Sequence, residues 1–80
     1  MHYVYLIRSI NNPERTYVGN TVNFKQRLDT HNSGGSKYTK PYRPWKLVMF
    51  LGFADKLKAT VFEKYLKSGA GSAFAKKRFW

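Results

Sequence analysis

Tyr3-Val4-Tyr5 and Tyr17-Val18-Gly19 are two short segments of aromatic and β-branched residues near the N-terminus. Residues 1–8 as a whole favour a strand, with the tyrosines on one face and the aliphatic residues on the other. Residues 16–19 predict a second short strand, and Asn11-Asn12-Pro13 between them is typical of a turn. The two segments therefore predict a β-hairpin that carries tyrosines on both of its strands.

A helix, a loop and a third strand are predicted after the hairpin. Residues 20–23 supply N-cap side chains for a helix that continues through His31. Residues 32–43 contain glycine, proline and several basic residues, which indicate a long loop. The apolar run over residues 44–53 predicts a third strand, and we expect this strand to be the buried spine of the core.

The C-terminal third of the chain predicts two more helices. Asp55 is a candidate N-cap, and Lys67-Ser68-Gly69 is a signal for the end of the first of these helices. Residues 70–80 predict a final short helix that docks through Phe74 and Phe79. We expect the first helix to pack through its apolar positions at helical spacing, which are Leu57, Val61, Phe62, Tyr65 and Leu66. The prediction is a single α/β (α+β) domain over residues 1–80, with the order β-β-α-β-α-α.

The composition of the chain is strongly basic. Its 80 residues include 15 Lys and Arg against 4 Asp and Glu, which gives a formal net charge of +11. Such an excess of positive charge favours binding to a polyanion, because contact releases the counterions that the polyanion holds. No apolar run approaches the ~18 residues of a membrane span, so we expect a soluble, cytoplasmic protein with no membrane partner.

Several kinds of catalytic and metal site are excluded by the residue inventory. The chain has no cysteine, which removes disulfides and thiolate metal sites. No acidic residue lies within two positions of another, and this separation argues against a two-metal carboxylate site. There is no serine-hydrolase elbow and no phosphate-binding P-loop. Nucleic-acid binding, with or without catalysis, remains.

Glu63 lies in the middle of a predicted helix, between Phe62 and Lys64, and it has two interpretations. It could be a surface glutamate that pairs with Lys67 one turn later, for a few tenths of a kcal/mol. It also adjoins the predicted apolar face, from which its carboxylate could reach the sheet. One carboxylate can hold Mg²⁺ when water and a substrate phosphate complete the octahedron.

Arg27 and His31 are four residues apart, so they project from the same face of the predicted helix. They form either a solvated basic face or a phosphate clamp, in which the guanidinium binds phosphate and the imidazole relays a proton. Tyr5 and Tyr17 are either packing residues or groups that act on water. A phenol has a pKa of about 10, and it serves as a base only where nearby positive charge favours the phenolate.

Taken together, these residues resemble the GIY-YIG endonuclease superfamily, and in particular its small stand-alone bacterial members. Tyr3-Val4-Tyr5 stands at the first family triplet, with Tyr3 in place of the glycine, and Tyr17-Val18-Gly19 stands at the second. The matched elements follow the family order and cover nearly the whole chain. Those after the triplets are Arg27, the run His31-Asn32-Ser33-Gly34, the run Lys37-Tyr38-Thr39, the strand from Arg43 to Val48, and the helix from Glu63 to Gly69.

The resemblance implies a small three-stranded antiparallel sheet flanked by helices and a metal-dependent endonuclease that hydrolyses DNA phosphodiester bonds. It implies that Glu63 binds one divalent ion, Mg²⁺ or Mn²⁺, and that Tyr5 or Tyr17 orients or deprotonates the attacking water. Arg27 would then stabilise the charge on the pentacovalent phosphate, and His31 would support a tyrosine or the water. We expect a structured or damaged DNA substrate.

The basic surface of the chain is the predicted DNA-binding surface. The alternative function is a non-catalytic, basic nucleic-acid-binding module, either an accessory to DNA repair or associated with the ribosome. Recruitment by a targeting protein partner is a further expectation. The residues predicted to contact nucleic acid are Asn32, Lys37, Tyr38, Lys40, Tyr42, Arg43, Lys76, Lys77 and Arg78.

Overall fold

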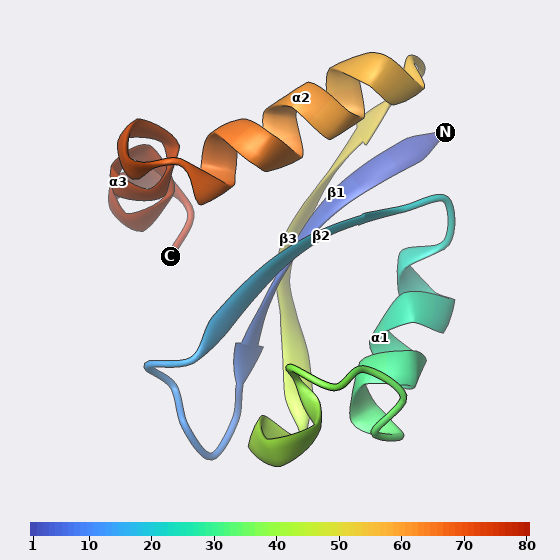
Figure 1. Ribbon diagram of the computed structural model, residues 1–80, viewed down its shortest axis with the longest axis vertical. Helices are drawn as coiled ribbons and strands as arrows, with labels where there is room; N and C mark the ends of the chain where they lie inside the picture. The colour runs from blue at the N-terminus through green and yellow to red at the C-terminus, as the bar shows by residue number, and fades with distance from the viewer.

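The computed structural model describes all residues from 1 to 80 and contains one three-stranded antiparallel sheet (Figure 1). The strands are β1 (His2–Ser9), β2 (Thr16–Thr21) and β3 (Trp45–Phe53), in the spatial order β2-β1-β3. The hairpin prediction is confirmed, since β1 pairs with β2 in a register that sets Tyr5 opposite Gly19 and Ile7 opposite Tyr17. The second strand is two residues longer than residues 16–19.

The buried spine of the core is β1, and the expectation that the third strand fills this role was wrong. Val4, Leu6 and Ile7 of β1 are fully buried, whereas most residues of β3 are only partly buried. A central strand is covered on both faces and both edges, while β3 lies at an edge of the sheet. A continuous apolar run therefore does not distinguish a central strand from an edge strand that is covered on its faces.

One face of the sheet is covered by α1 (Phe24–Asn32) and by the short 3-10 helix η1 (Lys40–Tyr42). The side chain of Asn23 caps α1 by accepting a hydrogen bond from the Gln26 amide, as the sequence predicts. Tyr5, Ile7 and Trp45 form the buried cluster of this face, and Phe24 and Leu28 of α1 pack against it.

The opposite face is covered by α2 (Lys56–Lys67) and α3 (Gly69–Arg78). Asp55 caps α2 as the sequence predicts, and Ser68, predicted only as part of the signal that ends α2, also caps α3. Val4, Leu6, Ala59, Leu66 and Ala75 form the buried cluster of this face. Phe79 packs against this cluster as predicted, whereas Phe74 is 40% exposed.

The predicted apolar face of α2 was only partly right. Leu66 is buried, but Leu57 is 69% exposed and Val61 and Tyr65 are also exposed, and the small Ala59 makes the close contact with the sheet. Leu57, Val61 and Tyr65 follow one another at four-residue steps, so they form one outward stripe along the helix. No helix in the structure combines the length and apolar character that a membrane crossing requires.

Candidate active site

Tyr5 lies on the α1 face of the sheet, where its ring crosses the neighbouring strand at Gly19. A Cβ atom added at Gly19 would lie only 2.2 Å from the Tyr5 hydroxyl oxygen. Any side chain at this position would therefore push the Tyr5 ring away from β2. The glycine of the Tyr17-Val18-Gly19 segment is the residue that lets the Tyr5 hydroxyl reach the edge of the sheet.

The Tyr5 hydroxyl forms a buried hydrogen bond with His31, which lies at the C-terminal end of α1. The His31 side chain is fully buried, with Nε2 2.9 Å from the Tyr5 oxygen and Nδ1 2.7 Å from Oγ1 of Thr39. The Thr39 hydroxyl is itself a donor to the Ser36 carbonyl, at 3.4 Å. Thr39 therefore accepts its other hydrogen bond from Nδ1–H, and this arrangement assigns the neutral tautomer whose Nε2 accepts from Tyr5.

Thr39 is also held through its backbone. The indole Nε1 of Trp45 donates to the Thr39 carbonyl at 2.8 Å, and Trp45 is itself buried. The Asn32 side chain holds the backbone of Trp45, because its amide group donates to the Trp45 carbonyl and accepts from the Trp45 amide. These bonds fasten the loop after α1 to the start of β3, and they fix Thr39 beneath His31.

Burial and the charge of Arg27 set the protonation of this pair. Burial raises the pKa of Tyr5 to about 12, although the Arg27 guanidinium interacts with the hydroxyl and opposes the rise. Burial also lowers the pKa of His31, and the nearby charge of Arg27 lowers it further. At neutral pH the pair is therefore a neutral phenol that donates to a neutral imidazole.

Tyr17 and Arg27 stand beside the buried pair. The Tyr17 ring lies 5.0 Å from the His31 ring and 6.4 Å from the Tyr5 ring, measured between centroids. The Arg27 guanidinium interacts with the hydroxyls of both tyrosines, and the contact with Tyr5 raises the pKa of Arg27. Arg27 and His31 thus project from the same face of α1, as their spacing predicts.

Glu63 approaches the same edge of the sheet from α2. Its carboxylate lies 2.8 Å from the Nζ atom of Lys67, and the side chain of Glu63 is only 20% exposed. The Lys67 ammonium also stands over the Tyr17 ring, 5.4 Å from its centroid. The expected pair between Glu63 and Lys67 is therefore present, and it lies against the tyrosines rather than apart from them.

The residues predicted to bind nucleic acid fall into two groups. The Lys37–Arg43 loop and the last turn of α3, which carries Lys76, Lys77 and Arg78, lie at separate places in Figure 1. The rings of Tyr38 and Tyr17 are 5.7 Å apart, so the loop adjoins the tyrosines. The amide of Asn32 is engaged with Trp45, and a contact of Asn32 with DNA stays a prediction.

Thr39 is the residue of this cluster that the sequence did not single out. Thr39 lies in a loop for which the sequence predicts only a basic character. Neither helical nor strand periodicity indicates that its side chain points inward. Thr39 does belong to the family-like run Lys37-Tyr38-Thr39. That run does not indicate which of its hydroxyl groups is buried. The sequence predicts Lys67 only as a partner of Glu63, and the position of Lys67 over Tyr17 depends on how α2 crosses the sheet.

A family model described as the GIY-YIG catalytic domain matches residues 1–77. The chain belongs to the GIY-YIG family. The match includes the two strands that carry Tyr5 and Tyr17, the helix that carries Arg27 and His31, and the helix that carries Glu63. The resemblance and the predicted fold class are both confirmed.

Relatives of this GIY-YIG chain are of two sizes. A UPF0213 protein of Clostridium perfringens is 41% identical over 68 residues, which cover 84% of this chain and 71% of that protein. The structure-specific endonuclease subunit SLX1 of Candida dubliniensis is 41% identical over 71 residues, which cover 80% of this chain. This chain spans 25% of the length of that SLX1 subunit.

A solved structure of a GIY-YIG relative has the same fold. The solution NMR structure of a UPF0213 protein from Bacillus halodurans matches with a TM-score of 0.56 and 29% sequence identity. The match covers 98% of this chain and 85% of the other. The three-stranded sheet with its helices is therefore shared along nearly the whole length of both chains.

Proposed function

We propose that this protein is a divalent-metal-dependent endonuclease that hydrolyses phosphodiester bonds in structured or damaged DNA. The observation that carries the proposal is the buried hydrogen-bond chain Tyr5–His31–Thr39. Its Tyr5 end lies beside Arg27 and Tyr17 at the edge of the sheet. Family membership and the name of the SLX1 relative, a structure-specific endonuclease subunit, support the same reaction. The net charge of +11 suits a polyanionic substrate.

Glu63 is the residue that would hold the divalent ion. No group of three or more His, Cys, Asp or Glu side chains gathers in the structure, so the protein would supply one carboxylate to the ion. A single carboxylate fits Mg²⁺ or Mn²⁺, because these hard cations accept water and phosphate oxygens as their other ligands. Bound there, the ion would polarise the scissile phosphate and stabilise the leaving 3′ oxygen. To bind the ion, the Glu63 carboxylate would first have to release its ion pair with Lys67.

Tyr5 would take the proton of the attacking water and pass its own proton to His31. A phenol with a pKa of about 12 is a weak acid, so it cannot be a standing phenolate at neutral pH. It can act as a relay, in which the water proton bonds to the Tyr5 oxygen while the Tyr5 proton moves to Nε2 of His31. The water oxygen then bonds to phosphorus and the bond to the 3′ oxygen breaks. Arg27 would stabilise the added negative charge on the phosphate.

Cleavage of a DNA panel tests the proposed function. Branched, flapped, nicked, single-stranded and duplex DNAs are incubated with the protein in Mg²⁺, in Mn²⁺ or in EDTA. We expect cleavage of at least one structured DNA with metal and none in EDTA. Binding that weakens steeply with salt, without product in either metal, would support the non-catalytic binding module instead.

Thr39 is proposed as a positioning residue that selects the tautomer of His31. Thr39→Val keeps the shape of the side chain and removes the acceptor for Nδ1–H. The other neutral tautomer of His31, which carries its proton on Nε2 and cannot accept a hydrogen bond from Tyr5, should then become populated. We expect kcat to fall about five- to tenfold, the effect of one hydrogen bond, with DNA affinity unchanged. Imidazole ¹⁵N NMR should show Nδ1–H in the wild type and a mixture in the variant.

The matched control is Thr30→Val, since Thr30 lies on the same helix as His31 and its hydroxyl donates only to a backbone carbonyl. Unchanged ¹⁵N shifts of His31 in Thr39→Val would contradict the tautomer assignment, whatever happens to the rate.

A further inference from the structure

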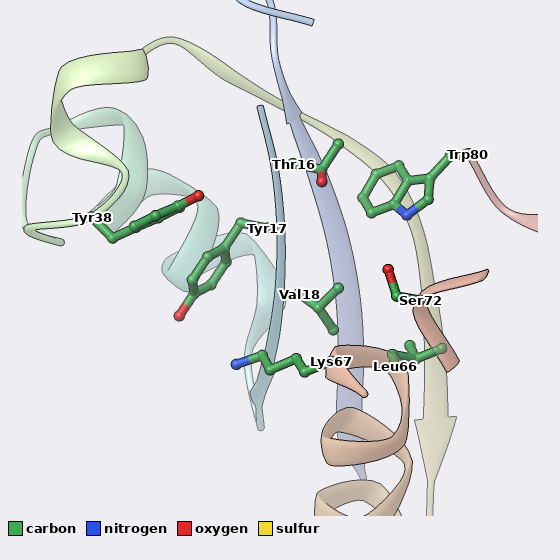
Figure 2. Close-up of a pocket in the computed structure, with 8 residues that line it drawn as sticks. All are labelled: Thr16, Tyr17, Val18, Tyr38, Leu66, Lys67, Ser72 and Trp80. Carbon is green, nitrogen blue, oxygen red and sulfur yellow. The ribbon is translucent and has the colours of Figure 1, made fainter. Parts of the chain in front are cut away.

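A cavity of about 230 Å³ opens at the edge strand β2, immediately beside the candidate active site. Figure 2 shows Tyr17 and Tyr38 on one side of β2 and Val18 and Trp80 on the other, so the hollow wraps around the edge of the sheet. Lys67, which pairs with Glu63, is part of its wall. The cavity therefore adjoins the carboxylate without containing it.

Aromatic rings lead from the surface to this cavity. Tyr38 is 51% exposed, and its ring lies 5.7 Å from Tyr17 and 6.4 Å from Tyr42, measured between centroids. The Tyr17 ring in turn adjoins His31. One face of the Trp80 indole is occupied by the Arg8 guanidinium at 5.4 Å, which holds the ring in place. The cavity thus lies among aromatic rings that are already fixed by their neighbours.

The chemistry of the wall suits a nucleobase. The volume is below the ~300 Å³ at which small-molecule sites begin, which leaves room for about one ring system. The hydroxyls of Thr16 and Ser72 and the ammonium of Lys67 supply polar partners, and no acidic side chain lines the cavity to repel the flanking phosphates. A base that is paired and stacked inside a duplex cannot enter such a hollow, whereas an unpaired base can.

We propose that this cavity binds one unpaired nucleobase next to the phosphate that is cleaved, so that the substrate is DNA with an unpaired nucleotide at that point. The inference rests on the proposed function, because it takes the adjoining carboxylate as the cleavage site. Stacking on tyrosine is tolerant of base identity, since every base has a π face. The site therefore selects unpaired structure rather than sequence.

The test compares two bulged duplexes in EDTA, where no cleavage occurs. One carries a single bulged thymidine, and the other carries an abasic nucleotide at the same position, so both have the same backbone charge. We expect the wild type to bind the thymidine bulge at least about fivefold more tightly, which is the smallest effect expected from stacking one base. Tyr38→Ala should bring the two affinities within about twofold of each other.

Tyr65→Ala is the matched control. Tyr65 is similarly exposed, at 42%, but it lies on the outward stripe of α2 and does not line the cavity. This variant should keep the preference for the thymidine bulge. Equal binding of both bulges by the wild type would overturn the proposal, as would an equal loss of preference in both variants.

The outcome separates this inference from the proposed nuclease activity. Preference for the thymidine bulge without cleavage in Mg²⁺ or Mn²⁺ would remove the activity and leave the base site standing. Cleavage without any preference for the thymidine bulge would support the nuclease activity and contradict the base site. A circular dichroism spectrum of each variant shows that it is folded, and we expect this for Tyr38→Ala because Tyr38 is an exposed loop residue.

Discussion

Glu63→Gln is expected to reduce DNA cleavage by about a thousandfold or more while DNA affinity in EDTA stays within about twofold of the wild type. The amide keeps the size of the side chain but has no charge with which to hold a divalent cation. An ion that polarises a phosphoryl oxygen contributes several kcal/mol to the transition state, and a loss of that size sets the expected effect. Cleavage rate against Mg²⁺ and Mn²⁺ concentration is the measurement.

Loss of the ion pair with Lys67 does not explain such an effect. A helical ion pair at four-residue spacing contributes about 0.3–0.5 kcal/mol, so its removal should leave the protein folded. Glu14→Gln is the control, because Glu14 is an exposed glutamate in the turn between β1 and β2. If Glu63→Gln retained a tenth of the wild-type rate at saturating metal, Glu63 would not be the metal ligand.

Arg27→Ala should reduce kcat by about 10²–10³-fold and weaken DNA binding much less. The guanidinium stands beside both tyrosine hydroxyls, where negative charge would build up on the phosphate, and loss of one such donor has effects of this size. Single-turnover kinetics separate the rate from the affinity. A large loss of affinity with an unchanged rate of the bound complex would make Arg27 a DNA contact only.

The pH dependence of the Arg27→Ala variant gives a second readout. The charge of Arg27 lowers the pKa of His31, so its removal should raise that pKa toward the ordinary value. His31 must be neutral to accept the Tyr5 proton, and activity is lost as the pH falls through its pKa. The acid limb of the rate profile should therefore move to higher pH in the variant. Lys25→Ala is a control on the same helix, since Lys25 is exposed at the surface.

The hairpin, α1 and the two caps were predictable because they depend on local chemistry. The tyrosine segments determine two strands, and Asn23 and Asp55 begin helices through their own side chains. Arg27 and His31 share a face because they are four residues apart on one helix. Gly19 belongs to the second tyrosine segment. The ring that requires a glycine at this position is that of Tyr5, on the neighbouring strand.

The misjudged features depend on neighbours that lie far away in the chain. The apolar run of β3 matches a central strand in composition, but pairing with β1 on one side alone makes it an edge strand. The stripe of Leu57, Val61 and Tyr65 has the spacing of a core face, yet Ala59 and Leu66 turn toward the sheet. Helical spacing identifies which residues share a face, and packing decides which face is covered.

The same division holds for the candidate site. Local sequence was enough to name Tyr5, Tyr17, Arg27, His31 and Glu63 as the candidate site residues, and their catalytic roles stay predictions. The bond from His31 to Thr39 and the place of Lys67 over Tyr17 arise only when a loop and a helix fold back onto the sheet. Hydrogen bonds are directional over about 3 Å, so the tautomer of His31 depends on tertiary contacts that no local pattern encodes.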